Sequence, residues 1–282
     1  MRVITTRKEM QEIAFNHKQN GEKVGFVPTM GFLHEGHLTL AKKARKDNDV
    51  VVMSIFVNPL QFGPNEDFET YPRDIKRDEK LAKDAGVDYL FVPSVEEMYP
   101  TTLSIQLSVQ KRVNVLCGKK REGHFDGVVT VLTKLFHLIL PNKVYFGLKD
   151  AQQVAVVDSL INDFFFPIEL VAVETVREDD GLAKSSRNVY LSDQERIEAV
   201  QLHKGLQMAK VAISNGEKNV NNIIMELKKH IQTTTSGKID YIEIYQYPSL
   251  EPLNKISGKI IIALAVHFSK ARLIDNLILK IN

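Results

Sequence analysis

The feature that most constrains the fold of this chain is a regular alternation of short, continuously apolar runs with longer stretches of helical periodicity. The run DVVVMSIFV at 49–57 is typical of a strand that is buried on both faces. Such strands, alternating with helices, predict a parallel sheet covered on both sides, and right-handed crossovers then give a Rossmann-like, doubly wound α/β fold. The expected strands are 23–29, 49–57, 87–92, 143–146 and 168–176, and the expected helices are 36–47, 75–85, 127–140 and 150–164.

The pattern changes after about residue 176. Helices followed by strands predict a smaller α+β domain with an antiparallel sheet. We therefore expect a large nucleotide- and substrate-binding domain over 1–176 and a smaller C-terminal domain over 177–282 that covers the site. The elements expected in the smaller domain are helices at 193–215 and 220–233 and strands at 239–245, 259–268 and 276–281.

Composition narrows the possible functions. With 37 Lys and Arg against 35 Asp and Glu, the formal net charge of +2 carries no electrostatic signature of nucleic-acid binding. Cys117 is the single cysteine, which excludes an internal disulfide and favours a reduced, cytoplasmic protein. No apolar run reaches the roughly 18 residues that would indicate a membrane span, and the first residues do not resemble a signal peptide. We therefore expect small-molecule partners, with neither nucleic acid nor membrane.

The loop after the first expected strand, MGFLHEGH at 30–37, carries the clearest chemical motif. Gly31 and Gly36 permit a tight turn and a close approach of the backbone to a ligand. The helix that follows presents unpaired N–H groups and the positive end of its dipole, which suit phosphate. His34 and His37 can both donate hydrogen bonds to one anion. The motif predicts a phosphate-binding loop, and the alternative is a pair of histidines with structural hydrogen bonds.

Three better-known motifs do not fit this loop. Gly31 and Gly36 have Walker A spacing, but His37 and Leu38 stand where that motif has Lys and Ser or Thr. A zinc-protease helix would need its second histidine at position 38, and a G-x-G-x-x-G fingerprint is absent. The remaining pattern, H-x-G-H between a strand and a helix, is similar to the signature of the nucleotidylyltransferase superfamily, whose members attack the α-phosphorus of ATP.

Polar residues also follow the other expected strands, at the edge where parallel sheets bind ligands. Asn58 and Gln61 follow the second strand, and their amides suit a hydroxy acid. Lys149 follows the fourth, where a compact cation can stabilise charge on the α- or β-phosphate. The segment 184–187, KSSR, follows the fifth and can grip a triphosphate with two cations and two hydroxyls. Turns, helix caps or a solvated linker are the alternative at each position.

Three further residues and one segment are candidate parts of the site. Asp150 either caps the next expected helix or holds part of a magnesium water shell. Gln153 lies about one helical turn beyond Lys149. Arg121 can reach an acid or a phosphate, although an exposed basic turn is the alternative. The polar segment 63–71, GPNEDFETY, is a candidate lid.

Together these motifs resemble those of the pantothenate synthetase family (pantoate–β-alanine ligases) over most of residues 24–192. One position departs from the family pattern, because Lys184 stands where the family usually has methionine. The lysine adds a charge near the expected phosphates, and we predict no loss of activity from it. The matching segments are PTMGFLHEGH at 28–37, FVNPLQF at 56–62, YPRD at 71–74, REGHF at 121–125, YFGLKDAQQ at 145–153 and TVREDDGLAKSSRNVYLS at 175–192.

The resemblance implies a two-step reaction. Pantoate attacks the α-phosphorus of ATP to form a bound pantoyl adenylate and pyrophosphate, and β-alanine then attacks the acyl carbon to give pantothenate and AMP. The resemblance also implies Mg²⁺ with the ATP and a cytoplasmic homodimer.

The resemblance also assigns site residues. His37 acts as the proton donor and His34 stabilises the phosphate transition state, with Lys149 and Arg187 as the other catalytic residues. Gln61 and Gln153 hold pantoate, with Gln61 also near β-alanine, and Asn58 and Arg121 are supporting substrate-binding contacts. Asp150 is the candidate magnesium ligand. The implied ATP site consists of Met30, Gly31, Phe32, Leu33, His34, Glu35, Gly36, His37, Gly147, Leu148, Lys149, Asp150, Val176, Lys184, Ser185, Ser186 and Arg187.

Three other functions fit parts of the pattern. A nucleotidylyltransferase would leave AMP on its product, whereas a ligase releases AMP when the amine is present. An aminoacyl-tRNA-synthetase-like protein would need a tRNA partner, and the balanced charge and short C-terminal region argue against one. A nucleotide-sensing module on the same fold would bind ATP without turnover.

Overall fold

The computed structural model describes residues 1–63 and 68–281. The chain forms two compact units. The larger comprises Met1–Val113, Gly118–Leu148 and Val156–Glu174, and the smaller comprises Asn114–Cys117, Lys149–Ala155 and Thr175–Asn282. The main division lies close to the expected boundary at 176, but two short stretches from the first 155 residues belong to the smaller unit.

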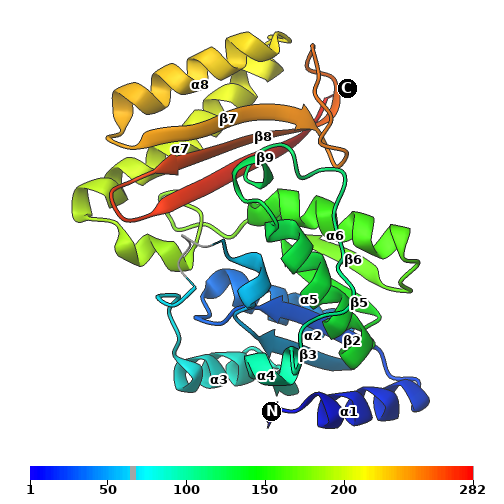
Figure 1. The fold of residues 1–282 in the computed structure, drawn as a ribbon. Helices are drawn as coiled ribbons and strands as arrows, with labels where there is room; N and C mark the ends of the chain where they lie inside the picture. The colour runs from blue at the N-terminus through cyan, green and yellow to red at the C-terminus, as the bar shows by residue number, and fades with distance from the viewer. Residues whose placement is uncertain (64–67, 282) are drawn as a thin grey trace. The chain divides into compact units, whose positions relative to one another are not determined.

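The larger unit is built on a six-stranded sheet in the order β1-β4-β3-β2-β5-β6, with every neighbouring pair parallel (Figure 1). The predicted Rossmann-like sheet is therefore confirmed. From β2 the chain builds outward in one direction through β3 and β4, and from β5 it builds in the other. This reversal makes the gap between the carboxyl ends of β2 and β5 the expected ligand crevice. The strands are β1 (Arg2–Ile4), β2 (Val24–Thr29), β3 (Val50–Ile55), β4 (Tyr89–Phe91), β5 (Lys143–Gly147) and β6 (Glu169–Val173).

Helices cover both faces of this sheet. Phe26 of β2 meets Phe136 of α5 with ring centroids 6.5 Å apart, whereas the next residue, Val27, joins a core with Leu40 and Ala41 of α2. Neighbouring strand residues point to opposite faces, so both faces of β2 are buried, as its continuous apolar sequence predicts. The helices up to this point are α1 (Arg7–Gln19), α2 (Glu35–Asp47), α3 (Ile75–Asp84), α4 (Val95–Met98), α5 (His124–Ile139) and α6 (Ala151–Asp163), with short 3-10 turns η1 (Pro59–Gln61), η2 (Gly118–Lys120) and η3 (Leu148–Asp150).

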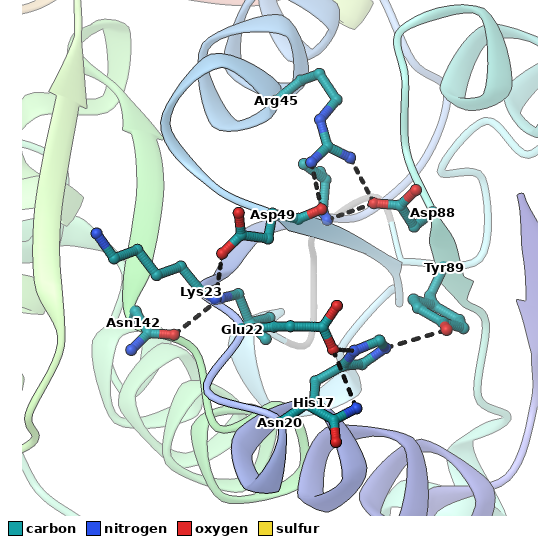
Figure 2. A network of polar contacts seen from close by, with 11 residues as sticks. His17, Asn20, Glu22, Lys23, Arg45, Asp49, Asp88, Tyr89 and Asn142 are labelled. Atoms are coloured by element: carbon teal, nitrogen blue, oxygen red, sulfur yellow. Dashed lines mark hydrogen bonds and ion pairs between the residues drawn. The ribbon is translucent and has the colours of Figure 1, made fainter.

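A polar network ties the amino ends of the strands together, away from the expected ligand crevice (Figure 2). Arg45 donates to Asp88 over 2.6 Å, and the same carboxylate accepts the N–H of Val51. His17 lies between Glu22 at 2.7 Å and the Tyr89 hydroxyl at 3.1 Å. The hydrogen bond from His17 lowers the pKa of the Glu22 carboxyl. These contacts connect neighbouring strands at their amino ends, whereas the expected binding loops follow the carboxyl ends.

The smaller unit pairs an antiparallel sheet in the order β7-β8-β9 with two helices (Figure 1). Ser192 and Glu195 form a capping box at the start of α7. Glu195 accepts the main-chain N–H groups of Ser192 and Ser269, which lower the pKa of its carboxyl to about 2. The expected α+β unit is confirmed. Its elements are η4 (Ser186–Tyr190), α7 (Asp193–Ser214), α8 (Val220–Thr234), β7 (Lys238–Gln246), β8 (Gly258–His267) and β9 (Arg272–Ile281).

Candidate active site

The loop between β2 and α2 has an unusual backbone. Gly31 and Phe32 both take positive φ angles, 87° and 49°. Asp78 of α3 holds this turn, because its two carboxylate oxygens accept the N–H groups of Phe32 and Leu33, each over 2.7 Å. Burial raises the pKa of the Asp78 carboxyl, and the two main-chain donors act in the opposite direction. Sequence pattern indicates only a charged helix here, although Asp78, Ala82 and Ala85 form one buried stripe.

His34 and His37 form a capping box at the start of α2. The Nδ1 atom of His34 accepts the N–H of Gly36 over 3.1 Å, and the Nδ1 atom of His37 accepts the N–H of His34 over 3.4 Å. The two rings lie 4.1 Å apart between centroids. A Cβ on Gly36 would meet the His34 ring at 2.8 Å, so any other residue there would displace that ring. Because each Nδ1 is an acceptor, the proton of each neutral imidazole lies on Nε2.

Beyond β3, Asn58 and Gln61 contact each other through Asn58 Nδ2 and Gln61 Oε1, 3.2 Å apart. Asn58 is 1% exposed, and it also donates to Gly127 O and accepts the Tyr99 hydroxyl. Its amide is therefore engaged inside the protein, and it holds Gln61. The Nε2 atom of Gln61 points to the sulfur of Met30, 3.0 Å away, which brings two expected site residues together.

The start of α5 supports the same segment. Gly127 packs so closely that a Cβ there would lie 2.2 Å from Leu60 O. His124 contacts Gln61 O through Nδ1 at 2.7 Å, and Arg121 Nη1 lies 3.0 Å from His124 Nε2. His124 therefore links Arg121 to Gln61, whereas the expected contact of Arg121 with a substrate stays a prediction. His124 belongs to a matching sequence segment, but the sequence pattern assigned it no role.

The end of β5 leads into η3. A Cβ added to Gly147 would meet nothing within 4 Å, so the space beside this backbone is open. Asn276 donates to the carbonyl of Lys149 over 2.9 Å and fixes the turn. The ammonium of Lys149 lies 3.7 Å from the carboxylate of Asp150, whose side chain is 52% exposed.

Two adjacent glutamines on α6 have different surroundings. Gln152 is buried and clamps the segment 114–117, since it donates to Val115 O and accepts the N–H of Cys117. Gln153, the residue expected to hold pantoate, is half-buried. The structure thus separates a structural amide from its candidate substrate-binding neighbour.

The segment after β6 forms a short hairpin. Lys184 N–H donates to Val176 O over 2.9 Å, and the Lys184 ammonium lies 3.3 Å from the Glu178 carboxylate. Ser185 caps η4, which contains Ser186 and Arg187. The hairpin holds these four residues, 184–187, in one short stretch of the smaller unit.

A buried ion pair anchors this hairpin. Both guanidinium nitrogens of Arg177 bond to Asp275 of β9, over 2.7 and 2.9 Å, and Arg177 also donates to Gly181 O. His203 packs against Gly181, where a Cβ would lie 2.7 Å from its ring. Burial and the charge of Arg177 lower the pKa of His203. Sequence pattern alone does not reveal the pairing, because Asp275 lies 98 positions from Arg177.

Two further expectations concern metal and lid. In residues 1–63 and 68–281 no group of three or more His, Cys, Asp or Glu side chains is arranged to hold a metal ion. The expected lid, 63–71, includes 64–67, which lie outside the described residues. On its described side, Phe68 and Tyr71 pack against Phe62, with centroids 5.4 and 6.1 Å apart.

A phosphate-suited loop at the switch point of a parallel sheet, with two imidazoles over a helix N-terminus, defines the class: a Rossmann-like enzyme that uses a nucleotide. A family model described as Pantoate-beta-alanine ligase matches residues 2–278. The chain belongs to this ligase family, as its motifs indicated.

Similar curated proteins and similar solved structures support the same family. The pantothenate synthetase of Geobacillus sp. (strain WCH70) is 64% identical over 99% of both chains. That of Bacillus subtilis (strain 168) is 61% identical over 100% of this chain and 98% of the relative. A crystal structure of pantothenate synthetase from Thermus thermophilus has a TM-score of 0.92 at 44% identity, covering 98% of this chain and 99% of that one. Pantoate-beta-alanine ligase from Francisella tularensis, complexed with beta-gamma ATP and beta-alanine, has a TM-score of 0.79 at 35% identity, covering 98% and 97%. Among the described helices, none is long and apolar enough to cross a bilayer.

Proposed function

We propose that this enzyme condenses (R)-pantoate with β-alanine and ATP to give pantothenate, AMP and diphosphate, through a bound pantoyl adenylate. The observation that carries the proposal is the pair of imidazoles at the start of α2, each with its Nδ1 atom accepting a main-chain N–H. Each ring then carries its proton as an Nε2–H donor, and such preorganised donors stabilise the charge that develops on phosphate oxygens.

In the first step a carboxylate oxygen of pantoate attacks the α-phosphorus, and the bond to the bridging oxygen of pyrophosphate breaks. We assign His37 as the proton donor, whose Nε2–H forms a hydrogen bond to the oxygen that leaves with pyrophosphate, and His34 as the ligand of the α-phosphate oxygens beside it. The main-chain N–H groups at the start of α2 and its dipole favour the same negative charge. We assign Lys149 and residues 184–187 to the triphosphate, and Gly147 to Asp150 and Val176 to the rest of the nucleotide site.

Mg²⁺ would accompany ATP. It commonly takes one or two carboxylates together with substrate phosphates, and the exposed Asp150 suits such a partial role. A bound ion would supply positive charge to the phosphates.

Pantoate is assigned to the two glutamines. Asn58 fixes the amide oxygen of Gln61, and the NH₂ group of Gln61 points to the sulfur of Met30. A thioether is a weak acceptor, and an oxygen of pantoate would replace it favourably. Gln153 holds the acid from α6. Arg121 supports Gln61 through its neighbour His124.

In the second step the amine of β-alanine attacks the acyl carbon, and AMP leaves with the carboxylate oxygen that formed the adenylate. Holding the amine near this carbon converts a bimolecular reaction into an effectively unimolecular one. We further propose that the smaller unit covers the nucleotide, and that the enzyme is a cytoplasmic homodimer. The family resemblance supports these assignments, and the single cysteine is consistent with a reduced compartment.

The test is a product assay with ATP, Mg²⁺ and pantoate labelled with ¹⁸O in its carboxylate. With β-alanine present, we expect equal amounts of pantothenate, AMP and pyrophosphate, with one ¹⁸O atom in the AMP. AMP without label would rule out the adenylate. Pyrophosphate without pantothenate would reassign the amine or the acid, and no consumption of ATP would favour the nucleotide-sensing alternative.

A further inference from the structure

The backbone of the H-x-G-H loop is not stabilised by its own sequence alone. Gly31 and Phe32 lie in the left-handed region, where a non-glycine residue such as Phe32 is strained. Thr29 Oγ1 accepts the N–H of Gly31 over 3.2 Å and donates to Ser54 O, which holds only the first residue of the turn. The next two residues therefore need a partner from elsewhere.

That partner is Asp78, which is 1% exposed. Successive N–H groups in such a turn form an anion-binding concavity, and here the carboxylate of Asp78 fills it. Arg77 adds to this contact, with its guanidinium 3.6 Å from Asp78 and 5.2 Å from the centroid of the Phe32 ring. The N–H groups of Phe32 and Leu33 are thereby both bonded to this carboxylate.

Packing supports the turn only in part. Leu33 lies in a buried core cluster with Leu40, whereas Gly31 and Phe32 line a pocket of about 260 Å³ together with Asp78 and others. A loop segment that borders a pocket can shift unless polar contacts hold it. The two hydrogen bonds from Phe32 and Leu33 to Asp78 hold this part of the loop in place. Because His34 follows directly after Leu33, they also fix the point from which the His34 side chain starts.

We propose that Asp78 is a positioning residue for the adenylation step: by binding the back of the loop it sets where the His34 and His37 imidazoles lie. The inference rests on the proposed function, since it concerns the same ATP site. Asp78 itself does not touch ATP in this arrangement, because both of its oxygens are occupied by the turn. Its effect should therefore fall on the ATP step and leave the amine step unchanged.

Two variants of Asp78 and one control separate the effect of the position of its carboxylate from the effect of its charge. Asp78→Asn keeps the shape but places an NH₂ group against one N–H donor. Asp78→Glu keeps the charge and moves the carboxylate by about 1.5 Å, one carbon–carbon bond, with the neighbouring cavity giving it room. Asp84→Asn is the matched control, an exposed carboxylate on the same helix.

For each variant, kcat/KM for ATP in pyrophosphate release, the KM for β-alanine and thermal stability are measured. We expect both Asp78 variants to lose about 10²-fold in kcat/KM for ATP, as a misplacement of about 1 Å does, with the KM for β-alanine unchanged. The control should match the wild type. Wild-type kcat/KM in Asp78→Glu would show that charge alone matters and would overturn the proposal, as would a loss of stability without a kinetic effect.

Amide hydrogen exchange gives a second test that uses only the wild type. It depends neither on catalytic activity nor on whether a variant folds. We expect the amides of Phe32 and Leu33 to be protected without ATP, because they bond to a buried carboxylate. Exchange as fast as in exposed loops would overturn the inference. A wild type that is protected there but makes no pantothenate would instead overturn the proposed function.

Discussion

Removing one partner of the Arg177–Asp275 pair should strongly destabilise the smaller unit. Asp275 is 3% exposed and makes a bidentate contact, so Asp275→Asn leaves a largely buried guanidinium without its counter-charge. Removing one partner of such a pair costs roughly 3–5 kcal/mol. Because the Arg177 side chain is 20% exposed, we expect the lower end, about 3 kcal/mol, or about 6–12 °C in Tm.

Denaturant titration and calorimetry of single and double variants test this magnitude. Arg177→Met with Asp275→Asn should recover part of the loss, because neither charge then lies buried alone, and the double-mutant cycle gives the coupling. Glu9→Gln is the control, since it breaks the exposed pair with Arg2 and should cost about 0.2–1 kcal/mol. A cost below about 1 kcal/mol for Asp275→Asn, or strict additivity in the double variant, would refute the reasoning.

Three further predictions concern catalysis and pH. His37→Ala and Lys149→Ala should each slow pyrophosphate formation by about 10²-fold or more while the circular dichroism spectrum is unchanged, and wild-type rates would remove the assigned role. Lys184→Met should retain activity, since the family usually has methionine there and the lysine already pairs with a carboxylate; an unchanged KM for ATP would show that the lysine adds nothing to binding, and a loss of turnover would contradict the prediction. The carboxyl of Glu195 has a folded pKa of about 2, below its ordinary value of 4.5, so its contribution to stability is present above pH 4.5 and is lost as pH falls toward 2. Urea midpoints should show this loss, and Glu195→Gln should flatten it.

Local sequence pattern predicted the parallel sheet because its central strands are buried on both faces. The run at 49–57 needs no partner information to be recognised, and β3 appears within it, at Val50–Ile55. The amino-terminal strand and helix, β1 and α1, were not predicted. β1 is three residues long, and α1 buries only Met10, Ile13 and Ala14 along an otherwise polar sequence.

Long-range polar partners explain what the sequence pattern did not reveal in the candidate site. The H-x-G-H loop was located from glycine and histidine spacing, whereas Asp78 is 46 positions from Phe32 and lies in a helix rich in charge. Asp275 likewise is a carboxylate in a strand that is mostly apolar. A carboxylate among buried apolar positions can be noticed in the sequence, but the residue that it bonds to can be identified only from the structure. The assigned contacts with ATP and pantoate stay predictions.

The tight packing of Gly127 against Leu60 bears on how such an enzyme can diversify. The residues that hold the binding segments, Gly127 and His124 behind Gln61, differ from the residue assigned to the substrate. A mutation at position 61 can therefore alter the ligand that is accepted while the frame stays in place. Directed evolution toward other acids should find its productive changes in the contacting side chains, and changes at the supporting glycine should be eliminated early.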